Sequence, residues 1–372
     1  MKRRSFNKLL AAGTVGALSG GAASCSKEST TKIAAKPTRM HVGCQRGDVT
    51  KEELEFKARH AVYHIDGRSP NFIEGVGWDI DDARRRKEMA QEYGISIDAY
   101  HLPLTSAGID GVSVPNIMLG KSPERDREIE LIQQMISVAG KTGVRALLYN
   151  TTILPVVRTE RVPGRGGSTY SSWDASIGME KSKELTRAGV VDVDTIYERI
   201  VYFLDRVLPV AEEYHVQLGN HIADPPLPAG FKGITRWNSP DILEGIKRFS
   251  SLSDSPSHGF NLCLGSTMEG MKDPNTEIHE VIRYVGGKKQ IFNIHMRNIK
   301  GGWGKFEEVF PDNGDADFLK VMRTLRDVEY AYMVMPDHVP KHPDDPNGNQ
   351  AFAFCYGYLG ALIKAVNAEV MA

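Results

Sequence analysis

Short apolar segments alternate with longer amphipathic segments from Arg39 onward, and this alternation limits the possible folds more than any other feature of the sequence. Each apolar segment has the length and composition of a buried parallel strand. Strands are expected at 40–44, 61–65, 95–101, 146–149, 216–221, 259–263, 291–296 and 331–335. Eight strand–helix units close most naturally into an α/β fold of the (β/α)8 TIM barrel type. A doubly wound open sheet is the alternative, but the chain has neither a G-x-G-x-x-G motif after the first strand nor a Walker A motif.

Amphipathic patterns predict the helices between these strands. Ser122, Pro123 and Glu124 supply an N-cap, a proline at the first helical position and an early acid for one helix. An apolar stripe predicts another helix over 193–214. Further helices are expected at 51–59, 81–93, 240–249, 275–284, 316–326 and 350–366. A long insertion after the fourth strand, 151–189, is rich in Gly, Arg, Ser and Thr, and we expect it to lie over the active face of the barrel.

The first thirty residues have the features of an export signal. The paired Arg3 and Arg4, followed by a short apolar stretch, resemble the twin-arginine signal of bacteria. Cys25 follows three small residues, which also resembles a lipoprotein signal with a lipid on Cys25. We therefore expect 1–30 to be a signal with the start of a linker, and 31–372 to be a single barrel domain. The protein is expected in the periplasm or held at the membrane by a lipid.

The composition excludes several classes of protein. Lys and Arg number 46 and Asp and Glu 47, so no global basic field recruits nucleic acid. Four Cys in 372 residues cannot form a disulfide scaffold. No apolar run is expected to reach the roughly 18 residues that span a bilayer as a helix. The composition is that of a soluble globular protein.

Four metal-binding side chains follow four consecutive strands. His221, Cys263 and His295 end the fifth, sixth and seventh expected strands, and Asp337 follows the eighth. In a barrel these ends converge on one face, where active sites lie. Each residue alone is more often part of a core than a ligand, but four in register favour a metal site. Two imidazoles, a thiolate and a carboxylate suit Mn, Fe, Co or Zn better than Ca or Mg.

Other polar residues are candidates for the same face. Arg297 could grip a carboxylate in a bidentate manner, or form a salt bridge at the rim. His338 adjoins Asp337 and is a candidate proton carrier that a nearby cation would keep neutral, or a partner that orients a ligand. The insertion carries arginines that could clamp an anionic substrate or remain solvated. The candidate substrate-binding residues are His101, Tyr149, Asn150 and Arg158.

The motifs around these residues resemble those of mannonate dehydratases, which are xylose-isomerase-like TIM barrels. GNHIADPP surrounds His221, NLCLGS surrounds Cys263, IHMRNI surrounds His295, and PDH ends at His338. The resemblance implies one divalent metal ion, typically Mn, held by His221, Cys263, His295 and Asp337. It also implies a hydro-lyase that removes water from D-mannonate to give 2-keto-3-deoxy-D-gluconate.

The chain departs from the family's pattern at several positions. Val339 replaces the usual Gly after PDH, Gln350-Ala351-Phe352 stands where the family carries Tyr-Asp-Arg, and the loop after Asn298 is short. The family is normally cytosolic, whereas this chain carries an export signal. The ligands are therefore expected to be retained while the substrate pocket is remodelled.

The implied reaction requires a base for the proton on carbon 2 and an acid for the departing 3-hydroxyl. His338 is expected in one role, and Tyr358 or a metal-bound water in the other. A sugar isomerase or epimerase on the same metal-dependent barrel is one alternative, and an exported lipoprotein that binds sugar acids without turnover is another. Arg297 and the arginines of the insertion favour an acidic small-molecule substrate. The oligomeric state stays open, a homo-oligomer included.

Overall fold

Eight parallel strands form a closed barrel in the computed structural model, which describes residues 36–371 apart from the side chain of Lys181. The strands follow one another around the barrel in the order β1-β15-β12-β11-β10-β6-β5-β2. Their bounds are β1 His41–Cys44, β2 His64–Gly67, β5 Ser96–His101, β6 Ala146–Tyr149, β10 Gln217–His221, β11 His258–Cys263, β12 Ile291–His295 and β15 Met333–Met335. All eight expected strands are present, so the (β/α)8 barrel is confirmed. The export signal and Cys25 lie outside the described residues.

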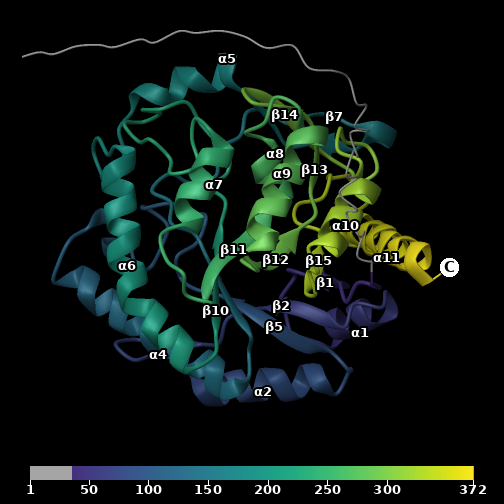
Figure 1. The fold of residues 1–372 in the computed structure, drawn as a ribbon, viewed down its shortest axis with the longest axis horizontal. Coiled ribbons are helices and arrows are strands. Elements are labelled where there is room, and N and C mark those ends of the chain that lie inside the picture. The colour runs from purple at the N-terminus through teal and green to yellow at the C-terminus, as the bar shows by residue number, and fades with distance from the viewer. Residues whose placement is uncertain (1–35, 372) are drawn as a thin grey trace, which may run out of the picture. The chain divides into compact units, whose positions relative to one another are not determined.

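Helices surround the strands (Figure 1). The long ones are α1 Lys51–Arg59, α2 Ile80–Gln91, α4 Glu124–Thr142, α6 Val193–Glu213, α7 Ile242–Ser250, α9 Pro274–Gly287, α10 Phe318–Asp327 and α11 Asn349–Met371. The short ones are α3 Asn116–Leu119, α5 Ala175–Gly178 and α8 Leu264–Met268. The N-cap expected at Ser122 was wrong: Pro123 occupies that position, and the Ser122 hydroxyl accepts a hydrogen bond from Arg125 instead.

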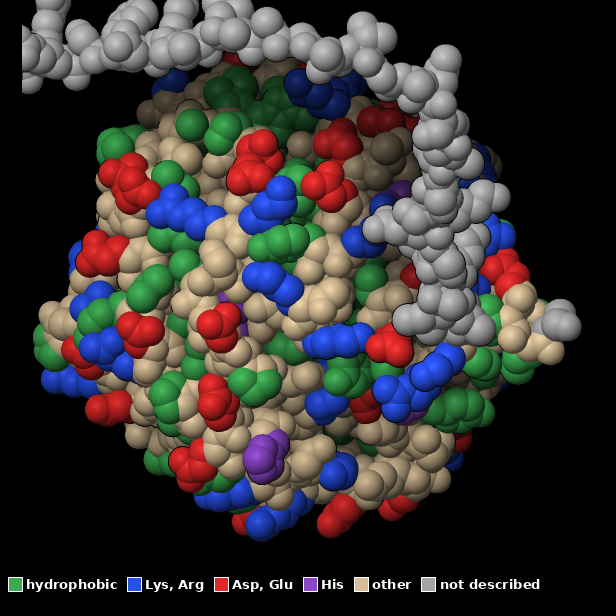
Figure 2. All heavy atoms as spheres, in the orientation of Figure 1, with side chains coloured by type: hydrophobic (Ala, Val, Ile, Leu, Met, Phe, Trp, Pro, Cys, Tyr) green, Lys and Arg blue, Asp and Glu red, His purple; other side chains and the backbone are tan. Residues whose placement is uncertain are grey.

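The last helix is more apolar than the sequence analysis allowed. By length and composition alone, α11 could cross a membrane, because polar residues are few and scattered in it. In the barrel it contacts α10, β1 and β15, which is the position of a closing helix. Elsewhere on the molecule acidic and basic side chains are interspersed, as the face in Figure 2 shows.

Alternation along the strands decides which side chains reach the barrel interior. Ala99, Ala146, Leu148 and Met333 form a small cluster separate from the large core that packs against the helices. A Cβ on Gly43 would lie 2.8 Å from the Cβ of Met333, so this interior layer accepts only glycine there. Since Cβ atoms alternate along a strand, residues two positions from this layer point to the same interior, and their immediate neighbours point to the helices.

A second, smaller sheet is built by the insertion and by a hairpin after β12. β9 (Ser172–Asp174) pairs antiparallel with β14 (Lys305–Val309), which pairs with β13 (Asn298–Gly302). The insertion also contains the β7–β8 hairpin, Val162–Pro163 with Thr169–Tyr170, and the 3-10 helices η1 Arg165–Gly167 and η2 Met179–Lys183. The hairpin β3–β4, Phe72–Ile73 with Gly77–Trp78, follows β2. The small sheet matters to the site because β14 carries Glu308.

Candidate active site

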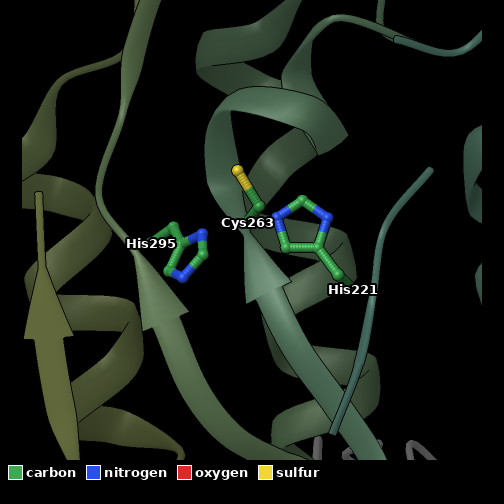
Figure 3. Close-up of side chains that lie close together, drawn as sticks. All are labelled: His221, Cys263 and His295. Carbon is green, nitrogen blue, oxygen red and sulfur yellow. The ribbon is translucent and has the colours of Figure 1, made fainter. Parts of the chain in front are cut away.

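Three metal-binding side chains meet at the carboxyl ends of three neighbouring strands. His221 ends β10, Cys263 ends β11 and His295 ends β12 (Figure 3). One ligand atom from each lies within 4.8 Å of the others. Cys263 and His295 are buried, and His221 is half-buried. The structure thus brings three of the four expected ligands together in one group.

Asp337 adds the carboxylate to this group. Its Oδ2 lies 3.5 Å from the sulfur of Cys263, and its Oδ1 lies 3.6 Å from Nδ1 of His295. Gln45, just after β1, donates a hydrogen bond of 3.0 Å from Nε2 to Oδ1 of Asp337. The four donors expected from the sequence therefore lie side by side.

The protonation of the donors fits a divalent cation. Nδ1 of His221 lies 2.6 Å from the carbonyl oxygen of Ile222, which can only accept, so Nε2 keeps its lone pair. Burial, partly opposed by Asp337, lowers the pKa of His295 to about 4, so this imidazole is neutral at pH 7. Its Nδ1 is buried without a hydrogen-bond partner among the described residues. A bound cation would satisfy this nitrogen.

The thiol of Cys263 must lose its proton to act as a ligand. Burial raises its pKa, Arg297 acts against that rise and Asp337 adds to it. Ser266 donates to the sulfur from its hydroxyl, at 3.2 Å. Because the thiolate is the ligand form, metal binding here would release a proton and would weaken as the pH falls.

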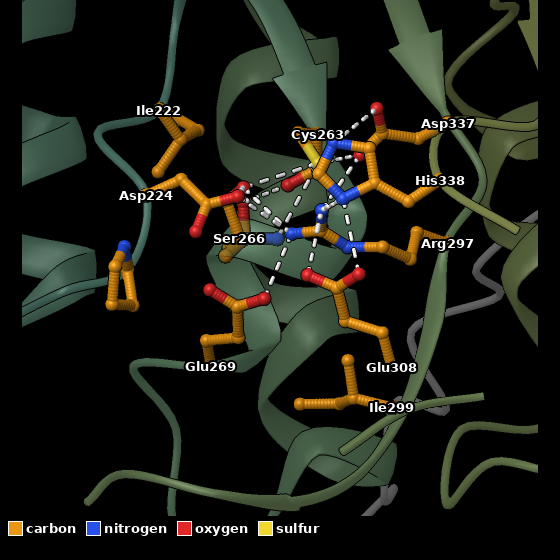
Figure 4. Close-up of polar contacts among 12 residues, drawn as sticks. Ile222, Asp224, Cys263, Ser266, Glu269, Arg297, Ile299, Glu308, Asp337 and His338 are labelled. Atoms are coloured by element: carbon orange, nitrogen blue, oxygen red, sulfur yellow. Dashed lines mark hydrogen bonds and ion pairs between the residues drawn. The ribbon is translucent and has the colours of Figure 1, made fainter. Parts of the chain in front are cut away.

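A buried guanidinium lies directly behind the donors. Arg297 is 2% exposed, and Figure 4 shows it surrounded by acidic side chains. One terminal nitrogen lies 2.9 Å from Asp224 and 2.8 Å from Glu269, and the other lies 2.9 Å from Asp337 and 3.4 Å from Glu308. Burial by itself disfavours the charge of Arg297, but the carboxylates, Glu308 foremost, raise its pKa well above the usual value. The residue is therefore a permanent buried cation.

This position corrects one expectation. Arg297 was expected to grip the carboxylate of a substrate, but all four acidic partners already belong to the protein. A Cβ on Gly265 would lie 2.2 Å from Nε of Arg297, so α8 packs against the guanidinium only because glycine stands there. Arg297 therefore positions Asp337 and its neighbours.

Arg158 completes the charge network from the insertion. Its guanidinium lies 2.6 Å from Asp224, 2.5 Å from Glu308 and 3.5 Å from Glu269. These carboxylates occupy it, so it is not free to bind an anionic substrate as expected. Burial, reinforced by Asp224, raises the pKa of Glu269 to about 8, which leaves this acid protonated at neutral pH. Asp224, Glu269 and Glu308 are close enough to suggest a cation site, but Arg158 and Arg297 already neutralise them.

His338 lies at the edge of this network and reaches the solvent side. Its ring is 45% exposed, and its Nδ1 lies 3.0 Å from Glu308 and 2.9 Å from Arg297. Its Nε2 lies 3.6 Å from Oδ1 of Asp337. Asp337, against burial and with help from Glu308, raises the pKa of His338 to about 9. These carboxylates outweigh the neighbouring guanidinium, and the neutral His338 that was expected beside a bound cation stays a prediction.

A second imidazole, that of His101, lies at the carboxyl end of β5 and so at the same end of the barrel. Nε2 of His101 lies 2.6 Å from Oδ2 of Asp66, which is almost fully buried at the end of β2. Burial disfavours the imidazolium of His101, but Asp66, and to a lesser degree Asp337, raise its pKa. The ring is 37% exposed and thus accessible. The expected position of His101 in the site is supported by this geometry.

Other expected site residues lie elsewhere. Tyr149 is fully buried and packs on Phe203 of α6 with ring centroids 5.6 Å apart, because it points away from the interior layer that contains Leu148. Asn150 comes two residues after Leu148, so its side chain points to the barrel interior, and it is 7% exposed. Tyr358 stacks on Phe354 of the same helix at 6.2 Å. The substrate-binding role expected for Tyr149 is thus corrected, and the catalytic role expected for Tyr358 has no support from its contacts.

Arg161 and Arg165, the other two arginines expected to form the clamp, are bound to neighbouring protein groups. Arg161 donates to Thr169 and Ser171 within the β7–β8 region, and Arg165 pairs with Asp312. The anion clamp proposed for this loop is therefore not formed by these side chains.

A cavity of about 530 Å³ lies between the insertion and the start of α11. Its walls include Arg165 of the insertion, Pro340, and the residues Gln350 and Ala351 at the start of α11. The departure from the family pattern at Gln350 and Ala351 therefore falls on the wall of this cavity.

Six polar residues of the site were not predicted from the sequence. They are Gln45, Asp66, Asp224, Ser266, Glu269 and Glu308. A signal existed for three of them: Asp224 and Ser266 lie in the GNHIADPP and NLCLGS motifs already identified, and Asp66 directly follows the expected strand 61–65. Glu308 comes from a hairpin outside the barrel, so no strand-end argument could have found it.

The buried cation makes a direct prediction about stability. Replacing Arg297 with Gln leaves three or four buried carboxylates without their partner, so we expect a loss of about 3–5 kcal/mol in the free energy of unfolding. Arg161→Gln is the control, since it removes an exposed arginine that bonds neutral oxygens, and it should change stability by only about 0.5 kcal/mol. Urea unfolding measures both. An equal, small change in the two variants would contradict the positioning role of Arg297.

Comparisons with known proteins agree with this geometry. The D-mannonate dehydratase (UxuA) family model matches residues 175–369. A mannonate dehydratase of Thermotoga neapolitana is 30% identical over 306 residues, covering 71% of this chain and 78% of that protein. The mannonate dehydratase of Enterococcus faecalis is 27% identical over 304 residues, covering 72% and 80%.

Solved structures show the same fold. The mannonate dehydratase of Streptococcus suis serotype 2 superposes with a TM-score of 0.70 at 24% identity, covering 89% of this chain and 94% of that one. A D-psicose 3-epimerase superposes with a TM-score of 0.55 at 11% identity, covering 88% and 99%. The family match across the second half of the barrel, together with relatives that align over most of both chains, shows that this chain belongs to the D-mannonate dehydratase (UxuA) family.

Proposed function

We propose that this protein is a metal-dependent hydro-lyase that removes water from a sugar acid, with D-mannonate as the first candidate and 2-keto-3-deoxy-D-gluconate as the product. The observation that carries the proposal is the meeting of His221, Cys263 and His295 with the carboxylate of Asp337 and with two accessible imidazoles. The two imidazoles are those of His101 and His338. Membership of the family gives the substrate class.

The donors fit one borderline divalent ion, with Mn²⁺ the first choice and Fe²⁺, Co²⁺ or Zn²⁺ as alternatives. His221, Cys263, His295 and Asp337 would hold it. A bound divalent ion supplies Lewis-acid stabilisation of the negative charge that develops beside the substrate carboxylate. Arg297 keeps Asp337 in the direction of the other donors, at 2.9 Å from its Oδ2.

Two histidines are placed to move protons. His338 is held at Nδ1 by Glu308, which leaves its Nε2 near Asp337 and the solvent side. His101 is held at Nε2 by Asp66, so Asp66 fixes the charge and orientation of this ring. The dehydration needs one group to take the proton from carbon 2 and another to protonate the departing hydroxyl. His101 takes the role that the sequence analysis had given to Tyr358.

The substrate screen tests the proposal. Purified, Mn²⁺-loaded protein is offered a panel of hexonates and pentonates together with free ketoses, and 2-keto-3-deoxy acids and epimers are measured. We expect a 2-keto-3-deoxy acid from D-mannonate or a close stereoisomer, because the cavity wall at Gln350 departs from the family pattern. Epimerised free sugar with no keto-deoxy acid would instead support the isomerase alternative. No turnover of any compound, with sugar acids bound, would support the binding-protein alternative.

Metal content should depend on the histidines. His221→Ala and His295→Ala should each remove most of about one divalent ion per chain, since a catalytic site keeps few protein ligands to spare. His279→Ala is the control, because His279 bonds Thr324 away from the site. Elemental analysis after dialysis measures the ion. Full retention in both variants would contradict the ligand assignment.

Variants of the two proposed proton carriers should differ from variants of the metal ligands in their metal content. His338→Asn and His101→Asn should keep the metal and lower turnover by about a hundred- to ten-thousand-fold. In Asp66→Asn the loss of a negative charge lowers the pKa of His101, so the limb of the pH–rate profile that reports His101 should move to lower pH. Loss of metal in His338→Asn, or an unmoved profile in Asp66→Asn, would contradict these roles.

We also propose that the protein is exported by the twin-arginine route. The paired Arg3 and Arg4 before a short apolar stretch support this. Changing both to Lys should keep the protein in the cytosolic fraction, and Cys25→Ser should release any membrane-held protein. Unchanged fractionation of both variants would contradict export by this route and the lipid anchor.

A further inference from the structure

A second group of metal-binding side chains lies at the amino-terminal ends of the barrel strands, opposite the candidate active site. His41 begins β1, His64 begins β2, and Asp98 lies near the start of β5. Because β1 pairs with β2 and β2 pairs with β5, three neighbouring strands each contribute one side chain. One ligand atom from each lies within 4.8 Å of the others.

A bulge in β5 turns Asp98 toward the two histidines. Ile65 of β2 pairs with Ile97, but the next residue, Asp66, pairs with Ala99. Asp98 is therefore the extra residue of the bulged strand. Bulges of this kind re-aim a side chain, and they are frequent beside functional sites.

The carboxylate of Asp98 serves both imidazoles. Its Oδ2 lies 2.9 Å from Nδ1 of His64 and 3.5 Å from Nε2 of His41. Its other oxygen accepts a hydrogen bond of 2.6 Å from the hydroxyl of Ser96, which fixes the plane of the carboxylate. Within the part of the chain that the structure describes, these two histidines are the only ion-pair partners of Asp98.

The hydrogen bonds of His41 leave one nitrogen unsatisfied. Its Nδ1 lies 3.2 Å from the carbonyl oxygen of Arg39, which can only accept, so Nδ1 carries the proton. Among residues 36–371, Nε2 is buried without a hydrogen-bond partner, and it faces the carboxylate of Asp98. A nitrogen lone pair and a carboxylate oxygen in this arrangement repel each other unless a cation lies between them.

Protonation of both rings is a poor solution. The rings of His41 and His64 lie against each other with centroids 3.7 Å apart. Two imidazolium ions at that distance would repel. One divalent ion shared by both rings and the carboxylate would remove the repulsion between Nε2 of His41 and Asp98. It would do so without placing a charge on either ring.

We propose that His41, His64 and Asp98 form a second metal site, structural in role, for a borderline divalent ion such as Zn²⁺. Ligand distances of about 2.1 Å in a tetrahedral site put neighbouring ligand atoms about 3.4 Å apart, which lies between the separations of 2.9 Å and 3.5 Å seen here. The side chains are 27%, 35% and 14% exposed, so an ion can enter from solvent and keep a water as its fourth ligand. Such an ion ties β1, β2 and β5 together and stabilises the start of the barrel.

Anomalous diffraction locates the ion without any substitution. The full chain, stripped of metal, reloaded with Mn²⁺ and crystallised, is soaked in Zn²⁺, and data are collected on both sides of the zinc edge. We expect a zinc peak about 2.1 Å from ring nitrogens of both His41 and His64. Zinc confined to the His221, Cys263 and His295 group would overturn the proposal. Its failure is separate from failure of the proposed function, because the two sites lie at opposite ends of the barrel.

Solution binding supplies the second test. Zn²⁺ is counted by equilibrium dialysis on untagged, Mn²⁺-loaded wild type, His64→Asn and the control His60→Asn, whose ring bonds a backbone carbonyl of α1. We expect His64→Asn to lose about one equivalent and His60→Asn to lose none. Zinc should raise Tm in the wild type and in His60→Asn, and this rise should vanish in His64→Asn only. Equal zinc content and equal Tm shifts in all three proteins would overturn the proposal.

Discussion

The ion pairs of Arg297 hold the whole catalytic end of the barrel in place. One guanidinium reaches Asp224 after β10, Glu269 after α8, Glu308 on β14 and Asp337 after β15. Taking such a charge out of water is costly, and removing it from four acids would cost more than the ordinary core mutation. The carboxyl ends of strands far apart in the sequence are therefore joined by one side chain.

Positive and negative side chains alternate in this network. Arg158 and Arg297 lie against the carboxylates of Asp224, Glu308 and Asp337. The network holds Asp337 in the orientation of a ligand and leaves His338 as an accessible ring. His221, Cys263 and His295 then come together because the barrel places the carboxyl ends of their strands side by side.

Much of this arrangement could be predicted from the sequence. The strand periodicity gave eight units, and Cys263 and His295 follow from the rule that active sites form at the carboxyl ends of barrel strands. The predictions failed for residues whose role depends on the direction in which the side chain points, or on a partner far away in the sequence. Tyr149 was misplaced because a four-residue apolar strand does not show which of its faces looks into the barrel. The role of Arg297 was misjudged because its acidic partners come from segments far from it in the sequence, Glu308 from an extra hairpin among them.

X-ray absorption on the Mn²⁺- or Co²⁺-loaded wild-type protein tests the central claim, that the ion is held at the four strand ends with the support of Arg297. We expect one sulfur at about 2.3–2.5 Å from the metal ion, together with two imidazole rings bound to it. Cys263→Ser should lose the sulfur alone. A shell of oxygen atoms only, unchanged in Cys263→Ser, would contradict it, because such a shell would place the ion among the carboxylates that Arg297 is assigned to neutralise.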